Sequence, residues 1–510
     1  MSASPSTEDF LAVASDFQLG MLDTERPHPK TIHLADWARN ELPTAISALR
    51  AVDRDALQIL EGRLGQLAPL RSTIRTVIDR GDRIFLCGCG ATGRLSIALE
   101  ILARQGLLRG ATAENVIGFM AGGDAALIRA IERFEDHPEY AERQLVELGF
   151  RKGDLLIAST EGGETPFVIG ATETAAAAGG EPPFFLYCNP DDLLREHVAR
   201  SRRVLDNEDI RKINLAVGPM ALSGSTRMQA STVLMAAIGF SMGSAELERA
   251  FESWKTWAVD QLDWSFLAPF IEAEASAYQS GDQVIYEPGP FRISVLTDTT
   301  ERSPTFALPA FERAASQEPA SLCYLHVPDS DSASQAWKNL LQRAPRPLEW
   351  GTLQHLTGAE AIARFDFSSG APERRRSATG RPQRIFRIDR VKGSIRWQFG
   401  NLEHHIPVPE GITPLGENLL LKMLLNAHST LVMGRLGRYE DNLMTYVAAN
   451  NFKLIDRAIR YTLLLLKRHH GLEPSYDTVA RTLLNERAGV APGEPIVLRT
   501  LATVLRLHAP

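Results

Sequence analysis

The stretch Arg83–Leu95 (RIFLCGCGATGRL) decides the fold. Residues 83–87 suit a buried parallel strand, and a helical stretch begins at Arg94, directly after three glycines. Glycines at such a turn let backbone amides approach a ligand, and the unpaired amides and dipole of a helix N-terminus favour an anion. The motif fits a dinucleotide loop, a phosphosugar loop in which the Thr92 hydroxyl contacts phosphate, or a tight connection without a ligand.

Length and composition limit the class of protein. A chain of 510 residues is long for one hydrophobic core, so we expect at least two domains. The net charge of −7 argues against a nucleic-acid partner. The four cysteines lack metal-finger spacing, which is typical of a reducing compartment and indicates neither a disulfide nor a metal site. With no signal pattern and no membrane-spanning run, we expect a cytoplasmic protein without a membrane partner.

The chain alternates between short apolar segments and helical patterns. After a loose N-terminus, helical spacing runs from Leu34 to about Asp79. Strands are then expected at 83–87, 115–120, 154–159, 183–188 and 213–217, with helices between them and a last helix over 225–242. This order predicts an α/β domain with a parallel sheet. Glycine-bearing turns follow several strands, at the carboxyl ends where such sheets bind ligands.

A second block repeats part of this order. Gly281-Asp282 and the strand after it repeat the opening at Gly81-Asp82, and a further strand is expected over 292–297, which indicates an internal duplication. The glycine loop is absent from the repeat, so we expect one phosphate site per chain. The arginine-rich stretch from Arg374 to Arg390 is interpreted either as a solvated loop and edge strand or as a partner-docking patch.

Several segments resemble one family, the SIS (sugar isomerase) phosphosugar-binding proteins. Gly88–Leu95 is similar to its phosphosugar loop, and other segments resemble N-acetylmuramic acid 6-phosphate etherase and the glucokinase regulatory protein: Ala121–Gly123, Cys188–Pro190, Gly218–Met228, Asn442–Met444 and Lys453–Ala458. The resemblance implies an α/β chain of two flavodoxin-like, three-layer SIS domains in tandem with helical N- and C-terminal extensions. The implied parts are 1–80 (arm and helices), 81–250 (first, phosphosugar-binding SIS domain), 251–435 (second, divergent SIS domain) and 436–510 (helical).

The resemblance also implies site residues. The etherases use two glutamates as acid and base, and the base position is matched by Glu135. The position of the acid in the first domain holds Leu102. Glu100 lies two residues earlier, so its side chain is expected to point in another direction from the helix. The motif around Glu301 in the second domain resembles the acid motif of the family, which makes Glu301 the candidate acid. The implied ligand-binding residues are Gly88, Gly90, Thr92, Gly93, Gly163, Thr165, Ser223, Ser225 and Arg438. Glu164 stands where the etherases have arginine, and a carboxylate there repels phosphate unless it points away.

Three functions remain open at this point. In the first, the chain acts on an (amino)sugar 6-phosphate as a lyase or isomerase, by proton abstraction α to the open-chain carbonyl. In the second, it is a non-catalytic phosphosugar sensor that regulates a protein partner. The third is a dinucleotide-dependent enzyme. Such enzymes require an acidic residue at the end of the second strand, but Ala121–Gly123 lies there instead. The first two functions require no cofactor. Because the chain is expected to carry two fused copies of the domain, it can be a monomer or a dimer.

Overall fold

The computed structural model describes residues 7–14, 19–108, 110–112, 114–131, 134–244, 246–449, 451–491 and 493–508. Its first sheet has the order β2-β1-β3-β4-β5, and every neighbouring pair is parallel. The strands are β1 (Ile84–Gly88), β2 (Val116–Met120), β3 (Leu155–Thr160), β4 (Phe184–Tyr187) and β5 (Arg211–Asn214). The predicted parallel α/β sheet is therefore confirmed, although β5 lies two to three residues before its expected position.

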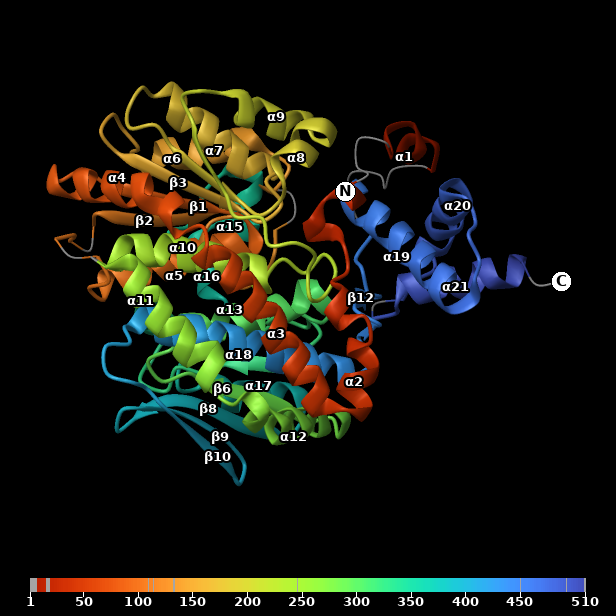
Figure 1. The fold of residues 1–510 in the computed structure, drawn as a ribbon. Helices are drawn as coiled ribbons and strands as arrows, with labels where there is room; N and C mark the ends of the chain where they lie inside the picture. Colours follow the sequence, from red (N-terminus) through yellow and green to blue (C-terminus); the bar gives the residue numbers. More distant parts are fainter. Residues whose placement is uncertain are drawn as a thin grey trace.

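Helices cover both faces of this sheet, which gives three layers (Figure 1). Alternate strand residues enter different cores: Ile84 and Leu86 lie in one, Phe85 and Cys87 in the other. One core is closed by α4 (Ala68–Asp79), α5 (Gly90–Arg104) and α10 (Gln229–Gly243), and the other by α6 (Pro138–Glu147), α7 (Pro166–Ala177), α8 (Asp191–His197) and α9 (Ala199–Asp206). Burial on both faces explains why the strands are apolar throughout rather than alternating.

The second sheet is mixed, so the expectation of a second fully parallel sheet is wrong. Its order is β10-β9-β8-β6-β7, with β6 parallel to β7 and β8, and β9 antiparallel to both β8 and β10. The strands are β6 (Gln283–Glu287), β7 (Cys323–Leu325), β8 (Gln383–Val391), β9 (Ser394–Phe399) and β10 (Leu402–Pro407). Buried and more exposed residues alternate along β9, as expected where one face of an antiparallel sheet meets water.

Some local expectations were also wrong. The strand expected over 292–297 is the first part of α13 (Arg292–Phe306), because Ile293, Leu296 and Thr300 lie on one helical face that is buried. The helix expected after Gly123 is only the 3₁₀ turn Asp124–Leu127. The helix expected from residue 225 begins at Gln229, since the preceding residues form a loop.

The long helix α18 (Pro414–Arg435) lies between the two sheets (Figure 1). All but three of its 22 residues are buried, as is typical of a helix in the centre of a large protein. It contacts α2 (Leu34–Asn40), α3 (Leu42–Glu61) and α10 on one side, and α12 (Leu267–Gln279) and α13 on the other. This helix therefore joins the two halves of the chain through one continuous core.

The arginine-rich stretch has an internal role. It forms α17 (Ala371–Thr379) and β8, and β8 lies between β9 and β6 rather than at an edge, because the β9–β10 hairpin covers its outer side. Arg384 pairs with Asp282 at 2.8 Å and Arg387 with Glu287 at 2.6 Å. The expectation of an edge strand is therefore wrong, whereas the expectation of a solvated stretch agrees with the exposure of most of these arginines, such as Arg384 at 62%. Arg384 and Arg387 link β8 to the segment around β6.

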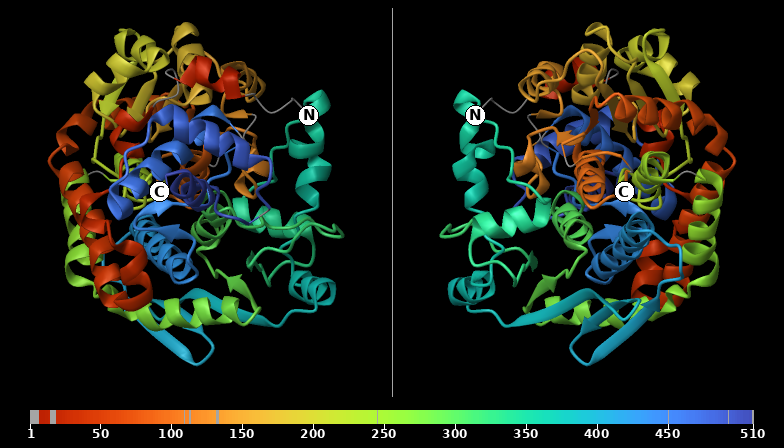
Figure 2. Two further views of the ribbon diagram at one scale, coloured as in Figure 1. Left: turned by 90° about the vertical axis from the view of Figure 1, so that its right-hand side faces the viewer. Right: turned by 90° about the vertical axis from the view of Figure 1, so that its left-hand side faces the viewer.

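The C-terminal part is helical apart from a short ladder, β11 (Tyr439–Glu440) with β12 (Leu443–Met444). The helices are α19 (Phe452–His470), α20 (Tyr476–Arg487) and α21 (Ile496–Leu507), and they gather at one side of the molecule, where α1 (Thr7–Val13) contacts α20 (Figures 1 and 2). The remaining helices are α11 (Leu247–Lys255), α14 (Ala333–Leu341), α15 (Gln354–Thr357) and α16 (Ala359–Ala363). Within the described ranges, no helix has the length and apolarity needed to cross a membrane.

A buried ion network fastens the loop after α14 to the first sheet. Arg343 pairs with Glu100 of α5 at 2.9 Å and also with Asp124, and Arg346 pairs with Glu100 at 2.8 Å. Glu100 is fully buried, so burial acts to raise its pKa, but the charges of Arg343 and Arg346 outweigh that effect and lower it. Glu100 points away from the glycine loop, as expected.

We predict that Arg343→Met lowers the free energy of unfolding by about 3 kcal/mol, because it leaves two buried carboxylates without their shared cation. Chemical denaturation at pH 7 measures the change. Arg249→Met is the matched control: Arg249 is 84% exposed and, among the described residues, pairs with Glu246 alone, so a change below about 0.5 kcal/mol is expected. Equal effects of the two substitutions would contradict a structural role for the network.

Candidate functional site

A cavity of about 270 Å³ lies at the carboxyl ends of β1 and β3. Six segments that are distant in sequence contribute to its lining: the arm at Leu22–Glu25, the turn after β1, the turn after β3, the loop Gly224–Arg227, the last part of α13, and the start of α19. In Figure 1 these segments meet where the first sheet, α13 and the C-terminal helices come together. The cavity therefore depends on both halves of the chain and on both extensions.

The three glycines of the β1–α5 turn have different roles. A Cβ on Gly88 would lie 2.3 Å from the Thr92 carbonyl carbon, and one on Gly93 would lie 2.5 Å from the Cβ of Met120. Both positions must stay small so that α5 can pack closely on β1 and β2. Gly90 has a φ of +54° and nothing within 4 Å of an added Cβ, and it lines the cavity. Of the three, Gly90 is the one that presents backbone to a ligand.

Thr92 does not face the cavity. Its side chain is buried, and its Oγ1 accepts a hydrogen bond from the Cys89 amide at 3.0 Å while donating to the Cys89 carbonyl at 2.9 Å. The expected contact between this hydroxyl and a phosphate is therefore not supported, and the alternative of a helix cap describes Thr92 better. The start of α5 contributes Gly90 and Ala91 to the cavity instead.

Thr165 and Ser225, two of the predicted ligand-binding residues, line the cavity. Thr165 precedes α7, and its hydroxyl lies 3.0 Å from that of Thr160. The buried Oγ of Ser225 has no hydrogen-bond partner among the described residues. A buried hydroxyl without a partner carries a desolvation cost, so Ser225 is well suited to bind a ligand oxygen.

Gly163, Ser223 and Arg438 do not line the cavity. Gly163 adopts a φ of +73°, and an added Cβ would lie 2.8 Å from Leu194, so it shapes the turn after β3. The Ser223 hydroxyl donates to the Glu25 carbonyl at 2.8 Å and ties down the arm. Arg438 follows α18, outside any helix, and stacks on the ring of Tyr446. Its expected place over the phosphate is therefore wrong.

Glu135 and Glu301 both line this one cavity, although they come from opposite halves of the chain. The side chain of Glu135 is 30% exposed, and Lys453 Nζ donates to it at 3.4 Å. Glu301 is buried and accepts no hydrogen bond from any described residue. Burial raises the pKa of Glu301, although Arg94, Arg227 and Lys422 act against that effect. Glu135 is thus partly exposed to solvent, whereas Glu301 is buried in the wall of the cavity.

A buried ion pair positions Glu301. Arg227 in the loop before α10 donates to Asp298 of α13 at 3.1 Å, and both side chains are 3% exposed. Arg227 also donates to Ser429 of α18 at 3.2 Å. Because residues three apart on a helix share a face, this pair directs Glu301 into the cavity.

Glu164 is neutralised by its neighbours. Lys453 donates to it at 2.6 Å, and Arg200 pairs with its other oxygen. Burial acts to raise the pKa of Glu164, but these two cations outweigh it and lower the pKa to about 2. Glu164, which stands where the etherases have arginine, therefore stays ionised and forms an ion pair with Lys453. Lys453 is then not free to bind phosphate.

The arm is closed over the cavity by another pair. Glu25 accepts from Arg457 of α19 at 2.7 and 2.9 Å, and the amide of Thr24 donates to Asn189 at 3.1 Å. Lys453 and Arg457 both lie in the segment Lys453–Ala458, which resembles the family, but the sequence alone gave no role for either. Their position in that segment was the signal that could have identified them.

Glu161 is the cavity residue that sequence reasoning missed entirely. It follows β3 directly, is 7% exposed, and its Oε1 has no hydrogen-bond partner among the described residues. Burial raises its pKa to about 8. A glutamate in a glycine-bearing turn normally reaches solvent, so its sequence position carried no signal for a buried acid.

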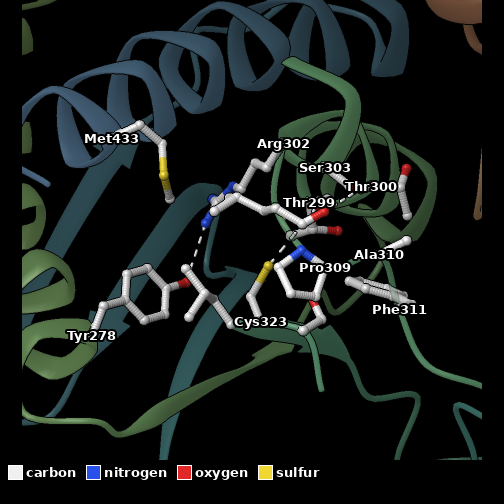
Figure 3. A pocket seen from close by; sticks show the side chains of 13 residues that line it. Tyr278, Thr299, Thr300, Arg302, Ser303, Pro309, Ala310, Phe311, Cys323 and Met433 are labelled. Atoms are coloured by element: carbon white, nitrogen blue, oxygen red, sulfur yellow. Dashed lines mark hydrogen bonds between the residues drawn. The ribbon is translucent and has the colours of Figure 1, made fainter. Parts of the chain in front are cut away.

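A second, much smaller cavity of about 10 Å³ lies inside the second half of the chain (Figure 3). Figure 3 shows Arg302 above Tyr278, to which it donates at 3.4 Å, with Cys323 and Pro309 nearby. Arg302 also pairs with Glu274 and Asp298. This space is about that of one water molecule, so it cannot hold a sugar. Over the described ranges, no group of three or more His, Cys, Asp or Glu side chains is arranged to hold a metal.

Comparisons with known proteins connect this geometry to a family. The sequence model of the glucokinase regulatory protein N-terminal SIS domain matches residues 68–176, which include β1, α5 and β3. N-acetylmuramic acid 6-phosphate etherase from Serratia proteamaculans is 32% identical over 216 residues, and that from Rhodopirellula baltica is 31% identical over 220. Each match covers 42% of this chain and 66% of the etherase, so the chain spans just under two thirds of these relatives.

Solved structures of similar fold include tagatose-6-phosphate ketose/aldose isomerase from Escherichia coli, with a TM-score of 0.40 and 13% identity over 78% of this chain and 94% of that one. The C-terminal domain of glucosamine-fructose-6-phosphate aminotransferase from Francisella tularensis has a TM-score of 0.34 and 9% identity over 75% and 96%. The family model and the etherase matches support a place in the SIS-domain phosphosugar-binding family, and the chain resembles N-acetylmuramic acid 6-phosphate etherase and the glucokinase regulatory protein.

Proposed function

We propose that this chain binds a sugar 6-phosphate in the cavity at β1 and β3 and acts on it by proton abstraction α to the open-chain carbonyl. The observation that carries the proposal is that Glu135 and Glu301 line one cavity beside the N-terminus of α5. A helix N-terminus favours a phosphate, and two carboxyl groups, one partly exposed and one buried, suit base and acid. The reaction is then that of a lyase or an isomerase.

The phosphate would be held mainly by neutral groups. The backbone of Gly90 and Ala91 and the hydroxyl of Ser225 line one part of the cavity, whereas Lys453 and Arg457 are paired with glutamates. Binding energy from this remote group would position the reacting carbon.

The two carboxyl groups would divide the proton transfers. The carboxylate of Glu135 takes the α proton, because it is the more solvated of the two. Glu301, whose pKa is raised by burial, gives a proton to the leaving oxygen in a lyase or relays it in an isomerase.

A non-catalytic sensor is the second candidate. The match to the N-terminal SIS domain of the glucokinase regulatory protein supports it, as does Leu102, which is buried in the core where the etherases have their acid. A protein partner would then recognise the ligand-bound form. The dinucleotide alternative has less support, because β2 is followed by Ala121–Gly123 and Asp124 is bound to Arg343.

We predict that one of a panel of sugar 6-phosphates raises the melting temperature while NAD does not, because a ligand present at 100 Kd stabilises the folded state by about 2.7 kcal/mol. Ala91→Glu should abolish the shift, since it places a negative charge in the cavity. A carboxylate is compatible with the first turn of a helix, so this variant should fold.

Ala199→Glu is the matched control, because Ala199 is an exposed residue at the start of α9. It should leave the shift unchanged. No shift with any sugar 6-phosphate, or the same loss in both variants, would contradict the proposal.

We further predict that Glu135→Gln and Glu301→Gln each lower turnover of the bound sugar by about 10²- to 10⁴-fold, with Kd changed only several-fold. Turnover is followed by NMR, as product formation and as exchange of the α hydrogen with D₂O. Glu196→Gln, at a side chain that is 73% exposed, serves as the control and should retain full turnover. Binding by the wild-type protein without turnover would favour the sensor.

A further inference from the structure

Glu161 is held rigidly at the end of β3 but is not used for structure. Its carbonyl oxygen accepts a hydrogen bond from the Cys188 amide at 3.0 Å, which fixes the backbone of the turn. Its side chain is 7% exposed and lines the large cavity, and its Oε1 has no hydrogen-bond partner among the described residues. A buried polar atom that faces a cavity without a partner points to a bound ligand.

No cation in the described part of the chain forms an ion pair with Glu161. Lys453 is bound to Glu164 at 2.6 Å and contacts Glu135. Lys422 donates to the Arg227 carbonyl at 2.7 Å and to the Thr232 hydroxyl at 3.1 Å. Ionising a carboxyl group here would bury a negative charge without a direct counterion, which is costly.

Burial outweighs the charged groups that face Glu161. These groups are Glu301 from α13, Lys422 from α18, Lys453 from α19 and Cys188 after β4. Burial is the largest cause of the rise of its pKa to about 8, and the charge of Glu301 raises it further, while a backbone hydrogen bond and the two lysines act in the opposite direction. A neutral carboxylic acid has one O–H to donate, which an ionised one lacks.

We propose that Glu161 is a second acid of this cavity, which donates its proton to the carbonyl oxygen of the sugar while Glu135 removes the α proton. This inference rests on the proposed function, and it assigns the two acids to different oxygens: Glu161 to the carbonyl, Glu301 to the leaving or relayed oxygen. Glu161 touches the reacting atoms in this scheme, and it supplies the hydrogen-bond donor that a developing enolate requires.

The proton transfer balances within the site. The α C–H bond breaks, its proton goes to the Glu135 carboxylate, and its electron pair forms the C=C bond. The π pair of the carbonyl forms the new O–H bond with the proton from Glu161. The sugar becomes an enol, Glu135 ends neutral, Glu161 ends ionised, and the total charge is unchanged.

The first test needs no ligand. Infrared difference spectra between pH 6 and pH 10 should show a protonated carboxyl C=O band that titrates near pH 8 and is reduced in Glu161→Gln but not in Glu196→Gln. Identical spectra for Glu161→Gln and the wild type would overturn the assignment of a neutral acid.

The same variants test the linkage of Glu161 to stability. Because the folded pKa lies above the unfolded value of 4.5, the neutral acid stabilises the fold fully below pH 4.5, and this contribution is lost as pH rises to about 8. Relative to Glu161→Gln, the wild-type unfolding constant should therefore rise up to about tenfold per pH unit between pH 5 and 8. Parallel pH profiles of the two proteins would also overturn the assignment.

The second test uses the sugar 6-phosphate that gives the largest melting shift. Glu161→Gln keeps a hydrogen-bond donor, so Kd at pH 7 should change by less than about fivefold, whereas α-hydrogen exchange in D₂O should fall by about 10² or more. Glu161→Asp should recover part of the exchange. Exchange at the wild-type rate in Glu161→Gln, with binding intact, would overturn the donor role alone. If the wild type binds no sugar phosphate, the proposed function fails together with the donor role, and the infrared test still reports the protonation state of Glu161.

Discussion

The ion pair between Arg227 and Asp298 is the contact on which the cavity depends. It joins the loop before α10 to α13. Ser429 of α18 hydrogen-bonds to both partners, so three distant parts of the chain meet at one buried ion pair. Burial acts to raise the pKa of Asp298, but Arg302 and Arg227 outweigh it and lower the pKa. Removing Asp298 would leave Arg227 buried without its counterion, and removing Arg227 would leave Asp298 with only Arg302 among the described cations, so either loss is costly. The pair directs Glu301 into the cavity.

The charges around the cavity are largely paired before any ligand arrives. Glu25 binds Arg457, and Glu164 binds Lys453 and Arg200. These pairs close the arm and the start of α19 over the first sheet, so the walls of the cavity are held by electrostatics across the whole chain. Among the described residues that line the cavity, the buried side-chain atoms Ser225 Oγ, Glu161 Oε1 and Arg227 Nε have no hydrogen-bond partner.

Much of the fold could be predicted because its signals are local. A run such as Ile84–Cys87 can be apolar throughout only if both faces of the strand are covered, which indicates a parallel sheet with helices on both sides. Predictions failed where a local pattern had two solutions. Residues 292–297 suit a strand or one face of a helix, and packing against α18 selected the helix. The arginines around Arg384 resembled an exposed edge until the β9–β10 hairpin placed β8 inside the sheet.

The sequence by itself determined the β1–α5 turn, its three glycines and the two glutamates Glu135 and Glu301, because these depend on short motifs and on the chemistry of single residues. The tertiary structure alone decided which of them face the cavity. The hydroxyls of Thr92 and Ser223 donate hydrogen bonds to backbone carbonyls, and Arg438 stacks on an aromatic ring. Contacts inside the protein therefore fix the orientation of each of these side chains. The acidity of Glu161 was decided in the same way, because a pKa is set by burial and by neighbouring charges, and its neighbours come from α13, α18 and α19.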